Sequence, residues 1–241
     1  MRPKRLGLIG AMEEEVRLLL EEMKEKTESV RAGIRFYEGM VQGHKAVVCT
    51  TGVGKVNAAV TTQILIDRFG VDAVLFTGVA GALHPELEIG DLVISSDCIQ
   101  HDMDASPLGY SPGMIPYQDN SVFAADRALI ALAEAACRDS GVHAVTGRVL
   151  SGDRFIADRK EAAALREQFA GCCAEMEGAS VAQVCSMNEV PFLILRSMSD
   201  QADGSAEMSY REFTELASRR SHEILMYILK RLPDLSGTDT F

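Results

Sequence analysis

The sequence lacks a long uncharged apolar run. The longest such stretch, residues 73–83, contains two glycines and is too short to span a membrane. The basic amino terminus leads into three glutamates and not into a cleavable small-residue site, so no secretion signal is expected. A stripe of basic residues is also missing, and the formal net charge is -11. We therefore expect a protein that binds neither membranes nor nucleic acids.

Cysteine and metal-binding patterns are equally sparse. The six cysteines have neither the density of a disulfide framework nor the spacing of a zinc site, which predicts reduced thiols and a cytoplasmic location. The run HDMD at residues 101–104 offers possible ligands, but four consecutive loop residues rarely converge on one ion. No metal site is predicted.

The composition predicts one globular domain. The 241 residues are 47% hydrophobic and 24% charged, which favours a single domain over residues 1–232 followed by a loose tail at 233–241. Continuously apolar runs alternate with helical patterns, as in an α/β fold whose central sheet is covered by helices on both faces. The predicted strands are 6–10, 46–51, 73–77, 92–95 and 192–197. The predicted helices are 13–26, 55–69, 126–140, 158–169, 178–188 and 211–232.

A loop and two glycine-rich segments interrupt this pattern. Residues 97–120, rich in Gly, Pro, Ser and Asp, are too long for a simple connector and predict a functional loop. TGVGKV at 51–56 fails as a phosphate-binding loop, because the required glycine and serine or threonine positions hold Cys49 and Val56. GVAGAL at 78–83 lacks the spacing of a dinucleotide fingerprint. Both segments predict tight turns where a ligand can approach the backbone.

Three glutamates open the first predicted helix, in GLIGAMEEEV. Acidic residues at a helix start are stabilised by the macrodipole, so capping alone explains them. Helical periodicity places Glu14 opposite the apolar face and leaves Glu13 and Glu15 on its two flanks, without choosing between them. Three negative charges would repel a phosphate group at this turn.

Two more glutamates lie in AEMEGAS, which predicts a short strand with Glu175 and Glu177 on one face and Met176 on the other. Carboxylates in a half-buried strand need partners, and ribose hydroxyls are suitable ones. Exposure to solvent is the alternative explanation.

An apolar strand, FLILRSMSD, ends in polar residues that include Arg196, Ser199 and Asp200. Ligands of open α/β sheets bind beyond the carboxyl ends of such strands. Burial would favour a protonated Asp200, whereas an ion pair with Arg196 would favour the carboxylate, and the sequence leaves both open.

Seven short motifs resemble, in their order along the chain, those of the 5′-methylthioadenosine/S-adenosylhomocysteine nucleosidase family: GAMEEE, GVGKVNAA, TGVAGAL, the pair Gly90 and Asp91, SGDRFI, EMEG and RSMSD. Each motif alone is weak, but their combination spans nearly the whole chain and is specific. The resemblance implies a three-layer α/β/α sandwich of the nucleoside phosphorylase type with a central mixed sheet. It also implies a homodimer without a cofactor that releases adenine by N-glycosidic hydrolysis, as in methionine salvage.

The resemblance assigns catalytic roles to two carboxyl groups. Glu15 matches the general base that positions and activates water, which would resolve the choice between Glu13 and Glu15. Asp200 matches the general acid that protonates adenine N7. Loss of adenine leaves positive charge on the sugar, so acid assistance and a poised water both lower the barrier.

The resemblance also implies contacts to each part of the substrate. Leu108 and Pro116 of the neighbouring subunit complete an apolar pocket for the 5′-thio group. The other contacts are Gly81 by its backbone, Phe155 and Ile156 with adenine, Met176 and Glu177 with ribose, Arg196 with water, Ser199 with Asp200, and Tyr210. Val79, Leu108 and Tyr210 replace a frequent serine and two frequent phenylalanines, which leaves the preference among 5′ substituents open.

Three other functions remain as alternatives. A purine nucleoside phosphorylase on the same fold would want positive charge where phosphate attacks, and Glu15 argues against it. An aminofutalosine hydrolase would use the same pocket. A catalytically silent nucleoside-binding module is disfavoured by the intact Glu15 and Asp200.

Overall fold

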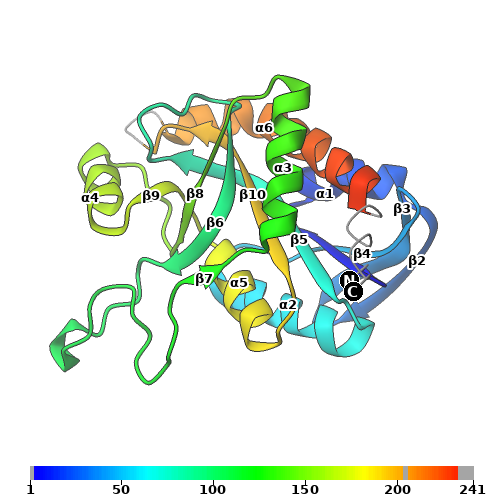
Figure 1. The fold of residues 1–241 in the computed structure, drawn as a ribbon, viewed down its shortest axis with the longest axis horizontal. Coiled ribbons are helices and arrows are strands. Elements are labelled where there is room, and N and C mark those ends of the chain that lie inside the picture. The colour runs from blue at the N-terminus through cyan, green and yellow to red at the C-terminus, as the bar shows by residue number, and fades with distance from the viewer. Residues whose placement is uncertain (1–2, 203–205, 233–241) are drawn as a thin grey trace, which may run out of the picture.

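The computed structural model describes residues 3–202 and 206–232, and a mixed sheet forms its centre (Figure 1). The strands are β1 (Leu6–Gly10), β2 (Lys24–Arg31), β3 (Ile34–Val41), β4 (His44–Thr50), β5 (Ala73–Ala82), β6 (Leu92–Gln100), β7 (Phe123–Ala124), β8 (Ala144–Ser151), β9 (Gly171–Glu175) and β10 (Phe192–Asp200). The helices are α1 (Glu13–Glu22), α2 (Lys55–Phe69), α3 (Arg127–Ser140), α4 (Arg159–Phe169), α5 (Gly178–Met187), α6 (Ala206–Arg231) and the short 3-10 helix Ser106–Leu108.

The sheet curls back on itself. Its strand order is β10-β6-β8-β9-β5-β1-β4-β3-β2, and β10 also pairs in parallel with β5, which closes part of the sheet into a ring. Both parallel and antiparallel pairs occur, as between β1 and β5 and between β10 and β6. β5 is therefore the central strand, bonded to β1, β9 and β10.

Helices cover both faces of this sheet. α6 packs on β10 and β5, with α1 and α3 beside it, while α2 and α5 pack together on the opposite face (Figure 1). Buried apolar side chains of β1, β4, β5 and β10 are nearly all inaccessible to solvent, as expected for strands covered on both sides. The predicted α/β fold with a central mixed sheet is confirmed.

Several predicted boundaries are wrong. The first helix was expected to extend to residue 26, but it ends at Glu22, and Lys24 begins β2. β2 is an exposed, highly charged edge strand, so its residues carry no apolar alternation that would mark it. β3 and β8 were also not predicted. α6 begins at Ala206, before the expected residue 211, and the tail proposed for 233–241 lies outside the described residues.

Two predictions about glycine and glutamate positions need correction. GVAGAL is not a turn, because β5 continues through Gly78 and Gly81 to Ala82. The strand predicted in AEMEGAS stops at Glu175, so Glu177 follows the strand and precedes α5 instead of sharing a strand face with Glu175. The expected loop begins after Gln100, and Figure 1 shows it projecting from the body between β6 and β7. In the described segments, every helix is too short or too polar to cross a bilayer.

Candidate active site

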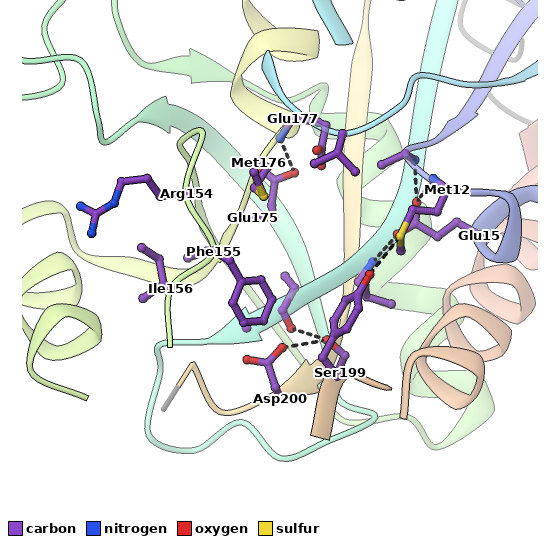
Figure 2. A pocket seen from close by; sticks show the side chains of 17 residues that line it. Met12, Glu15, Arg154, Phe155, Ile156, Glu175, Met176, Glu177, Ser199 and Asp200 are labelled. Atoms are coloured by element: carbon purple, nitrogen blue, oxygen red, sulfur yellow. Dashed lines mark hydrogen bonds between the residues drawn. The ribbon is translucent and has the colours of Figure 1, made fainter. Parts of the chain in front are cut away.

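Segments from most of the sheet meet around one cavity of about 230 Å³. The segments that follow β1, β4, β8 and β9 line it, together with the ends of β9 and β10. β5 supplies its floor, and α6 closes one side. Figure 2 shows Glu15, Glu177 and Asp200 reaching it from three sides. Nine of the twelve residues assigned by resemblance line this cavity: Glu15, Gly81, Phe155, Ile156, Met176, Glu177, Ser199, Asp200 and Tyr210.

Glu15 is held rigidly at the start of α1. One carboxylate oxygen accepts hydrogen bonds from the backbone N–H groups of Ala11 (2.5 Å) and Met12 (3.1 Å), and the other accepts one from Val79 (3.0 Å). Burial raises the pKa of the Glu15 carboxyl, although the Arg196 guanidinium and these amides oppose the shift. Glu13, on the other flank, is exposed to solvent. The structure therefore places Glu15, and not Glu13, in the cavity.

Glu177 lies directly before α5. Its Oε1 accepts a hydrogen bond from the Gly54 backbone N–H at 2.8 Å, which ties it to the TGVGKV turn. Burial and the neighbouring Glu175 charge raise the pKa of Glu177 to about 8. The protonated form of Glu177 is therefore favoured near neutral pH.

This raised pKa has a consequence for stability. A group that holds its proton more tightly in the folded chain stabilises the fold at low pH, and this contribution is lost as the pH rises from 4.5 towards about 8. Glu177→Gln keeps an acceptor for Gly54 but never ionises. We expect it to melt roughly 4 °C or more above the wild type at about pH 9, because about 1 kcal/mol shifts the midpoint by 2–4 °C in a chain of this size.

Thermal melting curves at about pH 5 and about pH 9 test this expectation. The gain should shrink at the lower pH, and the exposed Glu14→Gln variant should show no comparable pH-dependent gain. Equal differences at both pH values would contradict the assigned titration.

Asp200 ends β10 on the opposite side of the cavity. Its Oδ2 accepts a hydrogen bond from the Ser199 hydroxyl at 2.9 Å, and its Oδ1 accepts one from the Ala202 backbone N–H at 2.8 Å. Gly81 lies against it, since a Cβ built there would be 2.8 Å from Asp200 Oδ1 and 3.0 Å from the Cβ of Ala202. The missing side chain of Gly81 thus makes room for Asp200 as well as for a ligand.

Gly81→Ala should therefore displace the Asp200 carboxyl. For the adenine release that the motif resemblance implies, we expect kcat to fall by about 10²-fold, the effect of a misplacement near 1 Å. Stopped or continuous assays of adenine release measure it, with the melting temperature as a check on folding. A folded variant with wild-type kcat would show that Asp200 tolerates the shift.

Aromatic and apolar side chains form the wall between these carboxyl groups. Phe155 is half exposed and meets Tyr210 edge to face, with ring centroids 5.7 Å apart and planes at 81°. The Tyr210 hydroxyl donates to the Met12 sulfur at 2.9 Å. Ile156 is buried beside them. A flat heteroaromatic ring fits such a wall by stacking.

Three of the assigned residues lie outside the cavity lining. Arg196 is fully buried behind it and pairs with Glu175 at 2.6 Å, so its ion pair is with that carboxylate and not with Asp200. Leu108 and Pro116 belong to the projecting loop, where Leu108 is 69% exposed (Figure 1). These two residues do not line the cavity of their own chain.

The HDMD segment contributes to loop anchoring. Asp102 accepts from Lys55 Nζ at 2.5 Å and from the Asp153 backbone N–H at 3.0 Å, and Asp153 accepts from the Lys55 backbone N–H at 2.8 Å. These bonds join the TGVGKV, HDMD and SGDRFI segments at the edge of the cavity. Over residues 3–202 and 206–232, no three His, Cys, Asp or Glu side chains gather in a way that could hold a metal ion.

Comparison with known proteins identifies the family. The profile described as "Phosphorylase superfamily" matches residues 5–230. A 5′-methylthioadenosine/S-adenosylhomocysteine nucleosidase of Bacillus thuringiensis is 39% identical over 95% of this chain and 99% of its own length. The chain belongs to this nucleosidase family of the phosphorylase superfamily.

Solved structures of nucleosidases agree with this placement. The Neisseria meningitidis 5′-methylthioadenosine/S-adenosylhomocysteine nucleosidase, in complex with methylthio-immucillin-A, has a TM-score of 0.91 and 38% identity over 94% of this chain and 99% of that one. A Helicobacter pylori futalosine hydrolase also has a TM-score of 0.91, with 34% identity over 95% and 98% of the two chains. Solved structures similar to this chain therefore include a futalosine hydrolase as well as 5′-methylthioadenosine/S-adenosylhomocysteine nucleosidases.

In this nucleosidase, the sequence analysis assigned no role to one buried carboxylate of the site. Glu175 lines the cavity and binds Arg196, yet the roles assigned within the EMEG motif were those of Met176 and Glu177. A signal was present: a glutamate ends the apolar strand GCCAE, and a buried carboxylate there needs a cation. The sequence could not show that the cation is Arg196, because the partner lies on another strand.

Proposed function

We propose that this chain hydrolyses the N-glycosidic bond of 5′-methylthioadenosine and S-adenosylhomocysteine, releasing adenine and the 5-thio-substituted ribose. The observation that carries the proposal is the trio Glu15, Glu177 and Asp200 around one cavity with an aromatic wall. Family membership over 95% of the chain supports the same substrates. The chemistry needs no cofactor.

Each carboxyl group has a separate task in this reaction. Asp200, against Gly81 and the Phe155 wall, protonates adenine N7 so that the base leaves as a neutral molecule. Glu15, fixed by three backbone amides, orients and deprotonates the attacking water. Glu177 binds the ribose hydroxyls. The ionised Glu15 carboxylate stabilises the positive charge that develops on the sugar.

The charges around the cavity favour hydrolysis over phosphorolysis. Arg154 is the one cationic residue among the described side chains that line the cavity, and its guanidinium pairs with Glu161 at 2.8 Å. Four acidic residues line the same space: Glu15, Glu175, Glu177 and Asp200. A phosphate dianion would enter against the charge of the ionised members, Glu15 and Glu175, whereas water would not.

Adenine release tests the proposal directly. Purified protein is incubated with 5′-methylthioadenosine, S-adenosylhomocysteine and adenosine, with and without inorganic phosphate, and adenine is quantified by chromatography. We expect phosphate-independent release of adenine and a free thio-sugar. Dependence on phosphate with formation of a sugar 1-phosphate would overturn the proposed hydrolysis.

A second substrate class is favoured by the similarity to the Helicobacter pylori futalosine hydrolase. The cavity has an adenine wall and ribose ligands that an aminofutalosine molecule could share. Including aminofutalosine in the same assay ranks the substrates by kcat/KM. A kcat/KM for aminofutalosine above that for 5′-methylthioadenosine would identify aminofutalosine as the preferred substrate of this chain.

The active form is a homodimer in this proposal. Val53 lines the cavity, and the exposed Val56 and Val60 continue an apolar strip from it along α2. The projecting loop carries Leu108 and Tyr117, two large hydrophobic side chains that are exposed in the single chain. A twofold contact would place each loop over the partner's cavity, where Leu108 and Pro116 complete the 5′-thio pocket.

Sedimentation or light scattering measures the mass in solution, and the homodimer requires twice the chain mass. Leu108→Asp should weaken the dimer and raise KM for 5′-methylthioadenosine, because it places a charge in an apolar contact. A monomeric, fully active wild type would contradict the arrangement. All six cysteines are unpaired and buried, which supports a cytoplasmic location. A role in methionine salvage is part of the same proposal and follows from its substrates.

A further inference from the structure

Glu175 is the most highly bonded carboxylate at the cavity. Its Oε2 accepts from Arg196 Nη2 (2.6 Å) and Nε (3.2 Å), and from the backbone N–H groups of Gly178 (2.7 Å) and Glu177 (3.1 Å). Its Oε1 accepts from the Gly178 N–H at 2.9 Å and from the Ser151 hydroxyl. These bonds occupy both oxygens, so the carboxylate works through protein groups.

The first of these groups is the backbone that carries Glu177. Glu175 binds the N–H of Glu177 itself and that of Gly178, the first residue of α5. A Cβ at Gly178 would lie 3.1 and 3.2 Å from the two Glu175 oxygens, so glycine is what allows the carboxylate to sit over the helix start. The Glu175 carboxylate thus fixes the backbone at Glu177, and with it the direction in which the Glu177 side chain projects.

The second group is the Arg196 guanidinium. Glu175 holds it on one side, and the ring of Phe76 lies 4.0 Å from its central carbon. On the far side, a Cβ built at Gly78 would be 2.7 Å from Arg196 Nη1 and 2.6 Å from Glu15 Oε1. Gly78 therefore opens the space in which this cation faces Glu15.

We propose that Glu175 is a positioning residue of the nucleosidase site, which fixes the backbone of Glu177 and holds Arg196 against Glu15. The inference rests on the proposed function, because it assigns work to Glu177 and Glu15. One carboxylate then orients the ribose ligand and the water-activating base together. Its charge also faces Glu177, alongside Arg196, Glu15, the Tyr210 hydroxyl and the Gly54 N–H.

Glu175→Gln and Glu175→Asp separate charge from position. The glutamine variant keeps the length of the side chain and loses its charge, so kcat/KM should fall by about 10²-fold. In a plot of kcat/KM against pH, the acid-side limb should move to lower pH by about one unit, because Glu177 ionises more readily without the neighbouring charge. The aspartate variant keeps the charge but withdraws it by one methylene. It should lose about as much kcat/KM while the limb stays in place.

Controls distinguish this role from general damage to the fold. Glu134→Gln removes an equal charge on α3, where the side chain binds only the Thr146 hydroxyl among the hydrogen bonds of the described residues, and should leave both readouts unchanged. Adenine binding by calorimetry should stay within about twofold in both Glu175 variants, because the Phe155 and Asp200 side of the cavity is untouched. If the glutamine variant does not fold, the aspartate variant, which retains the charge that pairs with Arg196, tests the proposal through its kcat/KM and its adenine binding.

Three results would overturn the proposal: wild-type kcat/KM in either folded variant, a loss in the glutamine variant without movement of the limb, or a loss accompanied by failure to bind adenine. Failure of the proposed function is distinguishable, because the unaltered chain would then release no adenine, or would release it only in the presence of phosphate.

Discussion

Asp200→Asn is expected to lower kcat for adenine release by about 10²- to 10⁴-fold, the range that a general acid contributes. Adenine is a poor leaving group as an anion, and an amide cannot deliver the proton that N7 requires. The Asp200 side chain lies at the end of β10, at the cavity and 1% exposed, so bulk water is a poor substitute for it.

The fold should survive this change because the local hydrogen bonds can be rearranged. Asparagine keeps an oxygen for the Ala202 N–H, and the Ser199 hydroxyl, which now donates to Asp200, can turn to accept from the new amide. KM and adenine binding should therefore change much less than kcat. The exposed Asp139→Asn variant serves as the matched control. A kcat within tenfold of the wild type would assign the proton to another donor.

Apolar strands were predictable from the sequence because they are buried on both faces. β1 was predicted with its observed bounds, and the runs that form β4, β5, β6 and β10 were recognised although their ends were misplaced. Their extension to Gly81, Gln100 and Asp200 depends on pairing with neighbouring strands, which local sequence does not encode. The polar ends of these strands are where the cavity forms.

β2 shows the opposite case. KEKTESVR has helix-forming residues and a helical apolar face just before it, so the first helix was extended into it, as far as residue 26. Its pairing with β3, from Thr27 opposite Glu38 to Arg31 opposite Ile34, overrides that preference. A solvent-exposed edge strand needs no apolar side chains, so the alternation of apolar and polar residues that normally indicates a strand is missing.

The candidate site was also predictable in part: its motif residues were found from the sequence, and the bonds between them were not. Motif resemblance located Glu15, Glu177 and Asp200, which come from separate parts of the chain and meet at one cavity. What it could not supply were the bonds behind them, since Glu175 and Arg196 are 21 residues apart and sit on different strands. Of the two alternatives left open for Asp200, the ion pair with Arg196 is not formed, because Arg196 pairs with Glu175.

Glu15→Gln should lower kcat for adenine release by about 10²- to 10⁴-fold, because the amide cannot take a proton from water. Both oxygens of Glu15 accept backbone N–H bonds, from Ala11, Met12 and Val79. An amide group at this position must turn its own N–H₂ towards at least one of these donors. The variant therefore loses a hydrogen bond while it is relieved of a buried charge, and these two changes in stability oppose each other.

Glu13→Gln is the matched control, since it changes the same residue type in the same turn of α1. Glu13 is exposed and lines a different, open groove, whereas Glu15 is 5% exposed and lines the cavity. Steady-state adenine release should be unchanged in Glu13→Gln and nearly abolished in Glu15→Gln. Comparable losses in both variants would mean that the negative charge of the helix start, and not one positioned base, drives the reaction.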